Sequence, residues 1–273
     1  MKILVTGGTG YVGKRLTNTL KKKGHTVLTL KTDITDFDAV NSAARGADAI
    51  IHLAAVIDTK ESMENPMKYF LINAVGTLNV LEAARQNKIK KVVFASSVKV
   101  YGKPAYLPID EKHPTSPISP YGYSKLVAED FCRAYSDFYG LTVVIARISN
   151  LYGPGQSSNL FLPTVLSQLK KDKIVVRNLD FKLDYIYIDD VVSALIRCLS
   201  YGKSDVFNFG YGRSVSGKEI MDILSKIAGR KLVVETTNLK KEKEQIIDYR
   251  KAKKMLNWEP KIGITEGLKR TAR

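Results

Sequence analysis

The chain has 273 residues, 44% of them hydrophobic and 26% charged, which is ordinary for a globular protein and long enough to bury a sizeable core. No apolar run reaches the roughly 18 residues of a membrane-spanning helix, and the N-terminus lacks a signal-peptide pattern, so we expect no membrane partner. The net charge of +16 favours an anionic partner, but the basic clusters lack interleaved aromatic residues, so no nucleic-acid partner is expected.

Short apolar runs alternate with amphipathic segments through the first 150 residues. The runs that we predict as strands are 2–6, 26–30, 49–53, 91–95 and 142–147. The segments between them that we predict as helices are 11–23, 36–44, 66–86 and 121–139. This alternation predicts an α/β fold of the Rossmann type, a doubly wound parallel sheet whose ligands bind at the carboxyl ends of its strands.

The second half of the chain is less regular. Residues 184–210 read as a strand, a helix and a strand that return to the sheet. We therefore predict a Rossmann domain made of 1–150 and 184–210. Residues 151–183 and 211–273 are predicted to form a smaller, discontinuous α/β substrate-binding domain.

A glycine turn, Thr6-Gly7-Gly8-Thr9-Gly10-Tyr11-Val12-Gly13, follows the first strand and opens the first helix. Glycines at these positions permit a tight turn and a close approach of the backbone to a ligand. The helix N-terminus then offers free N–H groups and a positive dipole end to a pyrophosphate. The turn therefore predicts a dinucleotide cofactor.

Tyr121 and Lys125 lie four residues apart and so on one face of a helix. An ammonium group near a phenol favours the phenolate, so we expect Lys125 to lower the pKa of Tyr121 and to make it a base. A second pair with this spacing, Tyr249 and Lys253, lies in a lysine-rich tail and is interpreted as a surface coincidence.

Further polar residues lie at predicted strand ends. Ser96 and Ser97 follow the fourth strand, where a hydroxyl can bind the substrate oxygen that Tyr121 deprotonates. His52 ends the third strand and is expected to be packed rather than catalytic. Cys132 and Cys198 form no C-x-x-C pair or ligand cluster, so we expect no metal and two buried thiols in a reducing cytoplasm.

Several segments together resemble the extended short-chain dehydrogenase/reductase family, in the NAD-dependent nucleotide-sugar epimerase/dehydratase branch that includes UDP-glucose 4-epimerases. Besides the glycine turn and the Ser97, Tyr121 and Lys125 set, these segments are 48–55, 65–81, 147–155, 184–191 and 256–260. They span nearly the whole chain.

The resemblance implies a catalytic triad of Ser97, Tyr121 and Lys125, and a nucleotide-diphosphate sugar as substrate. The residues implied to bind NAD, or NADP as the alternative, are Gly7, Thr9, Gly10, Tyr11, Val12, Gly13, Lys31, Asp33, Ile34, Leu53, Ala54, Ala55, Asn73, Ala95, Tyr121 and Lys125. Those implied to bind substrate are Ser97, Lys99, Tyr121 and Asn150. The family also implies a homodimer in which helices 66–86 and 121–139 of each copy form a four-helix bundle.

The implied reaction is a 4-epimerisation by transient oxidation at the sugar C4 hydroxyl. One departure concerns the cofactor: the second strand runs directly from Leu30 through Lys31 to Asp33. Relatives insert another helix and strand there, with an acid that binds the adenosine ribose. Asp33 matches the family's adenine contact, whereas Lys31 favours the 2′-phosphate of NADP. An NADPH-dependent nucleotide-keto-sugar reductase is therefore the alternative.

Other departures concern the substrate. Val98 and Lys99 occupy the positions where dehydratases carry acids, which disfavours a 4,6-dehydratase. Lys99 contacts either solvent or an anionic substrate group. Leu183 stands where many epimerases place a diphosphate-binding arginine, and Lys182 is adjacent to it. Lys240 or Lys241 is expected to replace a later arginine, with charge but without its bidentate geometry. A catalytically silent cofactor-binding regulator is a further, disfavoured reading, because it has no need of the Ser, Tyr and Lys set.

Overall fold

A computed structural model describes residues 1–30, 32–156, 160–176, 178–237 and 244–272. The predictions for Lys31, Lys240 and Lys241 therefore lie outside the described residues. A six-stranded sheet has the order β2-β1-β3-β4-β5-β9, and every neighbouring pair is parallel. Its strands are β1 (Lys2–Thr6), β2 (Thr26–Thr29), β3 (Ala49–His52), β4 (Lys91–Ser97), β5 (Thr142–Ile148) and β9 (Asp205–Phe209).

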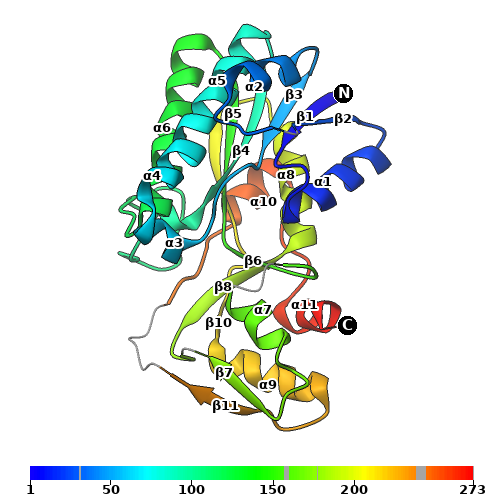
Figure 1. Ribbon diagram of the computed structural model, residues 1–273, viewed down its shortest axis with the longest axis vertical. Coiled ribbons are helices and arrows are strands. Elements are labelled where there is room, and N and C mark those ends of the chain that lie inside the picture. Colours follow the sequence, from blue (N-terminus) through cyan, green and yellow to red (C-terminus); the bar gives the residue numbers. More distant parts are fainter. Residues whose placement is uncertain (31, 157–159, 177, 238–243, 273) are drawn as a thin grey trace.

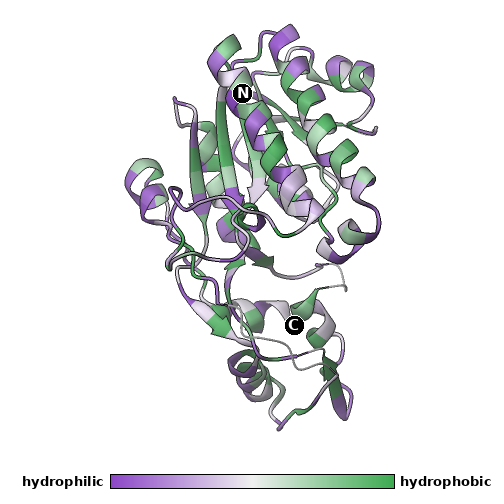
Figure 2. Cartoon of the chain, turned by 90° about the vertical axis from the view of Figure 1, so that its left-hand side faces the viewer, coloured by the Kyte–Doolittle hydropathy of each residue, from purple (hydrophilic) through white to green (hydrophobic). Residues whose placement is uncertain are grey.

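Helices cover both faces of this sheet (Figure 1). One layer contains α2 (Phe37–Ala44), α5 (Gly76–Gln86) and α6 (Pro120–Tyr139), and the other contains α1 (Tyr11–Lys22) and α8 (Ile188–Leu199). Successive strand residues point to opposite faces, so Leu4 packs in the first layer and Ile3 and Val5 in the second. The central residues of these strands are therefore mainly apolar, and the green strands between mixed helices in Figure 2 show this pattern. The predicted doubly wound α/β fold is confirmed.

A smaller part lies beyond the carboxyl ends of the strands (Figure 1). It has a sheet of β10 (Ser214–Ser216), β8 (Lys182–Tyr187) and β6 (Asn150–Tyr152), and a pair of β11 (Val233–Thr236) with β7 (Lys173–Val176). Its helices are α7 (Phe161–Leu166), α9 (Gly217–Ala228) and α11 (Ile264–Thr271). The segment 211–273 also contains α10 (Arg250–Leu256), which packs on β9 of the large sheet. The division into two domains is kept as a proposal.

The segment 66–86 is not one regular helix. It consists of α4 (Pro66–Tyr69), a π-helical turn (Phe70–Val75) and α5, and a short helix that the sequence pattern did not predict, α3 (Thr59–Glu64), precedes it. A π-turn inserts a residue into the helical ladder and often marks a functional position. Among the described residues, no helix is long and apolar enough to cross a membrane.

Candidate active site

The glycine turn begins where β1 ends, and β1 lies between β2 and β3. The strand order reverses there, which is the usual ligand position in an open α/β sheet. Gly7 has a φ of 67°, and the amide of Gly10 donates to its carbonyl at 2.9 Å. A Cβ on Gly13 would lie 2.0 Å from the Gly7 oxygen, so only glycine fits this close helix start.

The N-terminus of α1 has the properties of a phosphate-binding site. Its N-cap is Gly10, and no side chain caps the helix, so the first-turn amides face outward for an anion. Thr9 is exposed in the turn, while Val12 packs into the core. The hydroxyl of Tyr11 is buried and has no hydrogen-bond partner among the described residues. The turn therefore fits the pyrophosphate of a dinucleotide.

Two further predicted cofactor segments border this turn. The segment Leu53, Ala54 and Ala55 follows β3, and a Cβ on Gly7 would lie 2.7 Å from the Ala54 nitrogen. The Leu53 amide donates to the Thr6 carbonyl at 3.2 Å, which extends the pairing of β1 with β3 beyond the strand. The backbone at 53–55 thus forms one wall beside the glycine turn.

The second cofactor segment, Asp33 and Ile34, follows β2. The Thr35 amide donates to Asp33 Oδ1 at 2.9 Å, and Asn79 Nδ2 donates to the carbonyls of Ile34 and Thr35, both at 3.0 Å. Ile34 is buried against α5, whereas Asp33 is exposed at the sheet edge. The Asn79 contacts fix this loop beside the carboxyl end of β2.

Ser97 and Tyr121 meet at the carboxyl end of β4. Ser119 caps α6 by accepting from the Gly122 amide at 3.2 Å, and Pro120 occupies its first turn, so Tyr121 has a fixed position. Tyr121 is only 7% exposed. Burial raises the pKa of the Tyr121 phenol, and a hydrogen bond with Ser97 acts in the opposite direction.

Lys125 lies one turn further along α6 and is buried as well. Its Nζ donates to the Ala95 carbonyl at 2.8 Å and lies 4.7 Å from the centre of the Phe94 ring. Desolvation lowers the pKa of Lys125 to about 8. In this arrangement the Lys125 ammonium faces Ala95 and burial dominates at the phenol, so a lowering of the Tyr121 pKa by Lys125 stays a prediction.

Asn73 lies in the π-turn and is fully buried. Its Oδ1 accepts from the Val56 amide at 2.9 Å, while its Nδ2 donates to the Val56 carbonyl at 3.0 Å and to Ser124 Oγ at 2.9 Å. Ser124 in turn donates to the Tyr121 carbonyl at 2.8 Å. Asn73 therefore joins the chain after β3 to the helix that carries Tyr121 and Lys125. Whether it also contacts a cofactor stays a prediction.

His52 joins β1 to α5 in the same layer. Its Nε2 lies 2.9 Å from Thr77 Oγ1, which donates to the Asn73 carbonyl, so Nε2 must carry the proton. Its Nδ1 then accepts from Thr6 Oγ1 at 2.6 Å. Burial, assisted by the charge of Lys125, lowers the pKa of His52 to about 3. The packed histidine that the sequence predicted is confirmed.

Acidification is expected to destabilise the fold through His52. Between pH 6.5 and about 3 the unfolded chain binds a proton that the folded protein excludes, so stability falls as the pH falls, by about 1.4 kcal/mol per pH unit. His52→Gln keeps a neutral hydrogen-bonding side chain and removes this contribution. Chemical denaturation at pH 7.5 and 4.5 should therefore show a smaller loss for the variant than for the wild type, and equal losses would contradict the assignment.

The two predicted substrate residues outside the triad are in contact. Lys99 Nζ donates to Asn150 Oδ1 at 3.2 Å, and the Lys99 amide donates to Ser97 Oγ at 3.2 Å. Asn150 begins β6, which is the first strand of the smaller part. The structure thus brings the carboxyl end of β4 and the smaller part together at one point.

The sequence pattern gave no role to three residues that support this site, which are Glu129, Arg147 and Gln245. Glu129 and Arg147 form a buried ion pair with an Nη2–Oε2 distance of 2.6 Å, and Ser96 donates to the same carboxylate at 2.6 Å. Glu129 follows Lys125 by four residues on α6, and this spacing is a signal that could have identified it. Gln245 accepts from Asn150 Nδ2 at 2.9 Å, and no sequence motif marks it.

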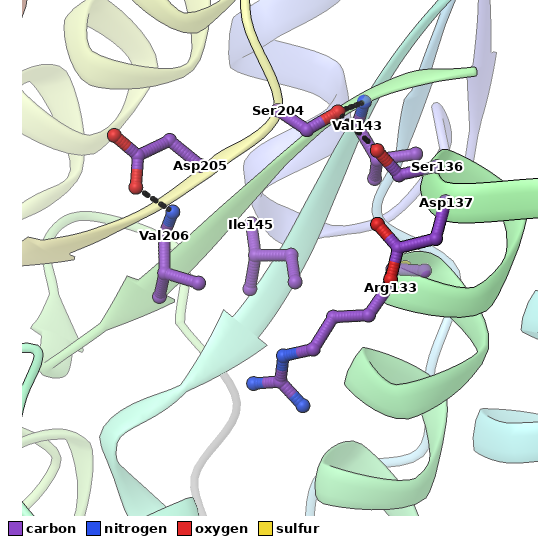
Figure 3. Close-up of a pocket in the computed structure, with 9 residues that line it drawn as sticks. Arg133, Ser136, Asp137, Val143, Ile145, Ser204, Asp205 and Val206 are labelled. Carbon is purple, nitrogen blue, oxygen red and sulfur yellow. Dashed lines mark hydrogen bonds between the residues drawn. The ribbon is translucent and has the colours of Figure 1, made fainter. Parts of the chain in front are cut away.

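A separate pocket of about 260 Å³ lies between α6 and the edge formed by β5 and β9 (Figure 3). Arg133 and Asp137 line its α6 side, and Val143 and Asp205 lie near the amino ends of their strands. None of the predicted site residues lines it. The candidate active site is therefore at the opposite, carboxyl end of the sheet.

Comparisons with known proteins agree with this geometry. The sequence model of the NAD-dependent epimerase/dehydratase family matches residues 3–210. A putative UDP-glucose 4-epimerase of Methanocaldococcus jannaschii is 34% identical, over 98% of this chain and 96% of its own length. A solved UDP-glucose 4-epimerase of Thermotoga maritima, with UDP-glucose, has a TM-score of 0.93 at 28% identity and covers 100% of this chain and 97% of its own.

A second solved structure contains a dinucleotide. RMD from Pseudomonas aeruginosa, complexed with NADPH, also has a TM-score of 0.93 at 28% identity, and covers 98% of this chain and 95% of its own. The family model covers well over half of the chain. Both solved structures share the fold of this chain along nearly their whole length. The chain therefore belongs to the NAD-dependent epimerase/dehydratase family of the short-chain dehydrogenase/reductase type.

Proposed function

We propose that the protein is an NAD(P)-dependent nucleotide-sugar 4-epimerase. The observation that carries the proposal is the hydrogen bond between Ser97 and Tyr121 at the carboxyl end of β4, beside a glycine turn that fits a pyrophosphate. A hydroxyl and a phenol placed together can hold one substrate oxygen between them. The relatives named as UDP-glucose 4-epimerases support the same reaction.

In this mechanism, Tyr121 removes the proton of the sugar C4 hydroxyl, and Ser97 donates to the same oxygen. A dinucleotide held by the glycine turn would supply the hydride chemistry at C4. Because burial raises the pKa of Tyr121, its phenolate requires a nearby cation. Lys125 is the buried cation on the same helix face, and we propose that it serves this role, with its ammonium also holding the nicotinamide ribose.

The NADPH-dependent nucleotide-keto-sugar reductase stays as a second candidate. Two observations favour it: β2 is the edge of the described sheet, without the additional strand of many relatives, and a structural neighbour was solved with NADPH. The two candidates differ in their consumption of cofactor. An epimerase regenerates its dinucleotide in each cycle, whereas a reductase oxidises one NADPH per product.

A proton NMR time course with UDP-, GDP- and dTDP-sugars and catalytic NAD tests the proposal. Conversion of a sugar into its C4 epimer without accumulation of NADH would support it and would name the substrate. An absence of conversion across the panel would reject it. The corresponding keto-sugars with NADPH, followed at 340 nm, would then test the reductase candidate.

We also propose a homodimer through the helices of 66–86 and 121–139. Met67, Leu71 and Val75 lie at successive turns, 69%, 47% and 39% exposed, and Tyr123 of α6 is 49% exposed. These elements lie along one flank of the molecule (Figure 1). Apolar side chains exposed in a row favour an interface with another chain.

Charge placed on this flank should break the dimer. Leu71→Glu is expected to shift the mass measured by light scattering from twice 30.4 kDa toward 30.4 kDa. Met255→Glu, at an equally exposed methionine on α10, should leave the mass unchanged and serves as the control. A wild-type protein that is monomeric at micromolar concentration would reject the proposed dimer.

A further inference from the structure

The side-chain amide of Asn150 has only one possible orientation. The Asp184 carbonyl, 2.8 Å from Asn150 Nδ2, can only accept a hydrogen bond, so the nitrogen must point toward it. The Lys99 ammonium, 3.2 Å from Asn150 Oδ1, can only donate, so the oxygen must point toward Lys99. Two independent neighbours thus assign the same orientation.

The second proton of the Asn150 amide is also used. It is donated to Gln245 Oε1 at 2.9 Å. Gln245 is 6% exposed, and its backbone N–H donates to the Lys182 carbonyl at 2.9 Å. Asn150 therefore has no N–H left for a ligand, but its Oδ1 retains a second lone pair.

Gln245 lies on a segment that connects both parts of the molecule. Two residues further along, the Ile247 amide donates to Asp184 Oδ2 at 3.0 Å. The Asp248 amide then donates to the Ile109 carbonyl at 2.8 Å, in the loop that precedes α6. This anchoring on two sides gives Gln245 a fixed position behind Asn150.

We propose that Gln245 is a positioning residue that holds Asn150 as a hydrogen-bond acceptor toward the sugar. This inference rests on the proposed function, in which Asn150 contacts the nucleotide sugar. The site then selects a sugar hydroxyl that donates to Asn150 Oδ1, beside Lys99, which donates to acceptor oxygens. An analogue that lacks the donating proton leaves the Asn150 oxygen without its partner and is rejected.

Matched variants of Gln245 test the positioning. Gln245→Glu keeps an acceptor oxygen for Asn150 Nδ2, whereas Gln245→Leu and Gln245→Met leave that N–H without a partner. We expect the two apolar variants to raise the KM for the converted nucleotide sugar about 10-fold with kcat within about threefold, the size of one hydrogen bond to a neutral group. The glutamate variant should restore KM to within about threefold of the wild-type value. Equal effects of glutamate and leucine, or no change of KM in any variant, would overturn the proposal.

Fluorinated substrates test the polarity. Fluorine in place of one sugar hydroxyl at a time, other than the C4 hydroxyl that is oxidised, removes the donor and keeps the size. The wild type should discriminate at least 10-fold against one such analogue, and Gln245→Met should lose that discrimination. Uniform tolerance of all analogues by the wild type would overturn the proposal.

Binding separates this inference from the proposed function. If the wild type converts no sugar, the proposed epimerase function is rejected. The positioning role can still be tested, because calorimetry measures the affinity for UDP-glucose with glutamine, glutamate or methionine at position 245. A loss of affinity in Gln245→Met that Gln245→Glu restores would support the positioning role without turnover. Equal affinities would overturn it. Circular dichroism of each variant identifies any that fails to fold. If one of the two apolar variants, Gln245→Leu or Gln245→Met, fails to fold, the other provides the comparison with Gln245→Glu.

Discussion

Tyr121→Phe is expected to lower kcat about 10³-fold while NAD binding stays within about threefold of the wild-type value. Phenylalanine keeps the ring at a position that is 7% exposed and removes only the hydroxyl that meets Ser97. Ser97 Oγ is hydrogen-bonded with Tyr121 and with the backbone amide of Lys99, and a backbone amide cannot act as the base in place of the phenol. Steady-state turnover and calorimetric titration of NAD measure the two quantities separately.

The chain provides a matched control at Tyr249. Tyr249 and Lys253 have the same spacing as Tyr121 and Lys125, but Tyr249 lies at the start of α10 and Lys253 is ion-paired with Glu259 at 2.6 Å on the surface. Tyr249→Phe should therefore leave kcat unchanged. If the protein were a cofactor-binding regulator, neither variant would change turnover and both would retain NAD binding. A fully active Tyr121→Phe would reject Tyr121 as the base.

The parts of the site that depend on neighbouring residues in the chain could be predicted from the sequence. The glycine turn needs only a strand, three glycines and a helix start, and the structure shows that a Cβ at Gly13 would collide with Gly7. The helix of Tyr121 has a local start signal in Ser119 and Pro120, which the structure confirms. Alternating apolar and amphipathic segments likewise predicted five strands of the large sheet to within two residues at either end.

The parts that depend on long-range contacts could not. The burial that raises the pKa of Tyr121 is a property of the folded chain, and the spacing to Lys125 does not reveal it. Asn73 sits in a π-turn that the regular spacing of 66–86 does not reveal. Gln245 contacts Asn150 from 95 positions away, across an irregular segment without a recognisable pattern. Such positioning contacts become visible only when the tertiary structure is known.

Arg147→Met is expected to lower the free energy of unfolding by about 3 to 5 kcal/mol. Glu129 is fully buried and Arg147 is 3% exposed, and the guanidinium donates to both carboxylate oxygens. It also donates to the Tyr101 hydroxyl at 2.9 Å, which itself donates to Asn208 on β9 at 2.7 Å. Removing the arginine leaves a buried carboxylate without its main partner. Chemical denaturation followed by circular dichroism measures the loss.

The same carboxylate provides the control. Arg133 also pairs with Glu129, at 2.8 Å, but is 41% exposed, so water replaces much of this interaction and Arg133→Met should cost no more than about 1 kcal/mol. The double variant Glu129→Met, Arg147→Met should be less destabilised than Arg147→Met alone, because it removes the isolated charge. If Arg147→Met and Arg133→Met lower the free energy of unfolding equally, burial does not determine how strongly an arginine stabilises Glu129.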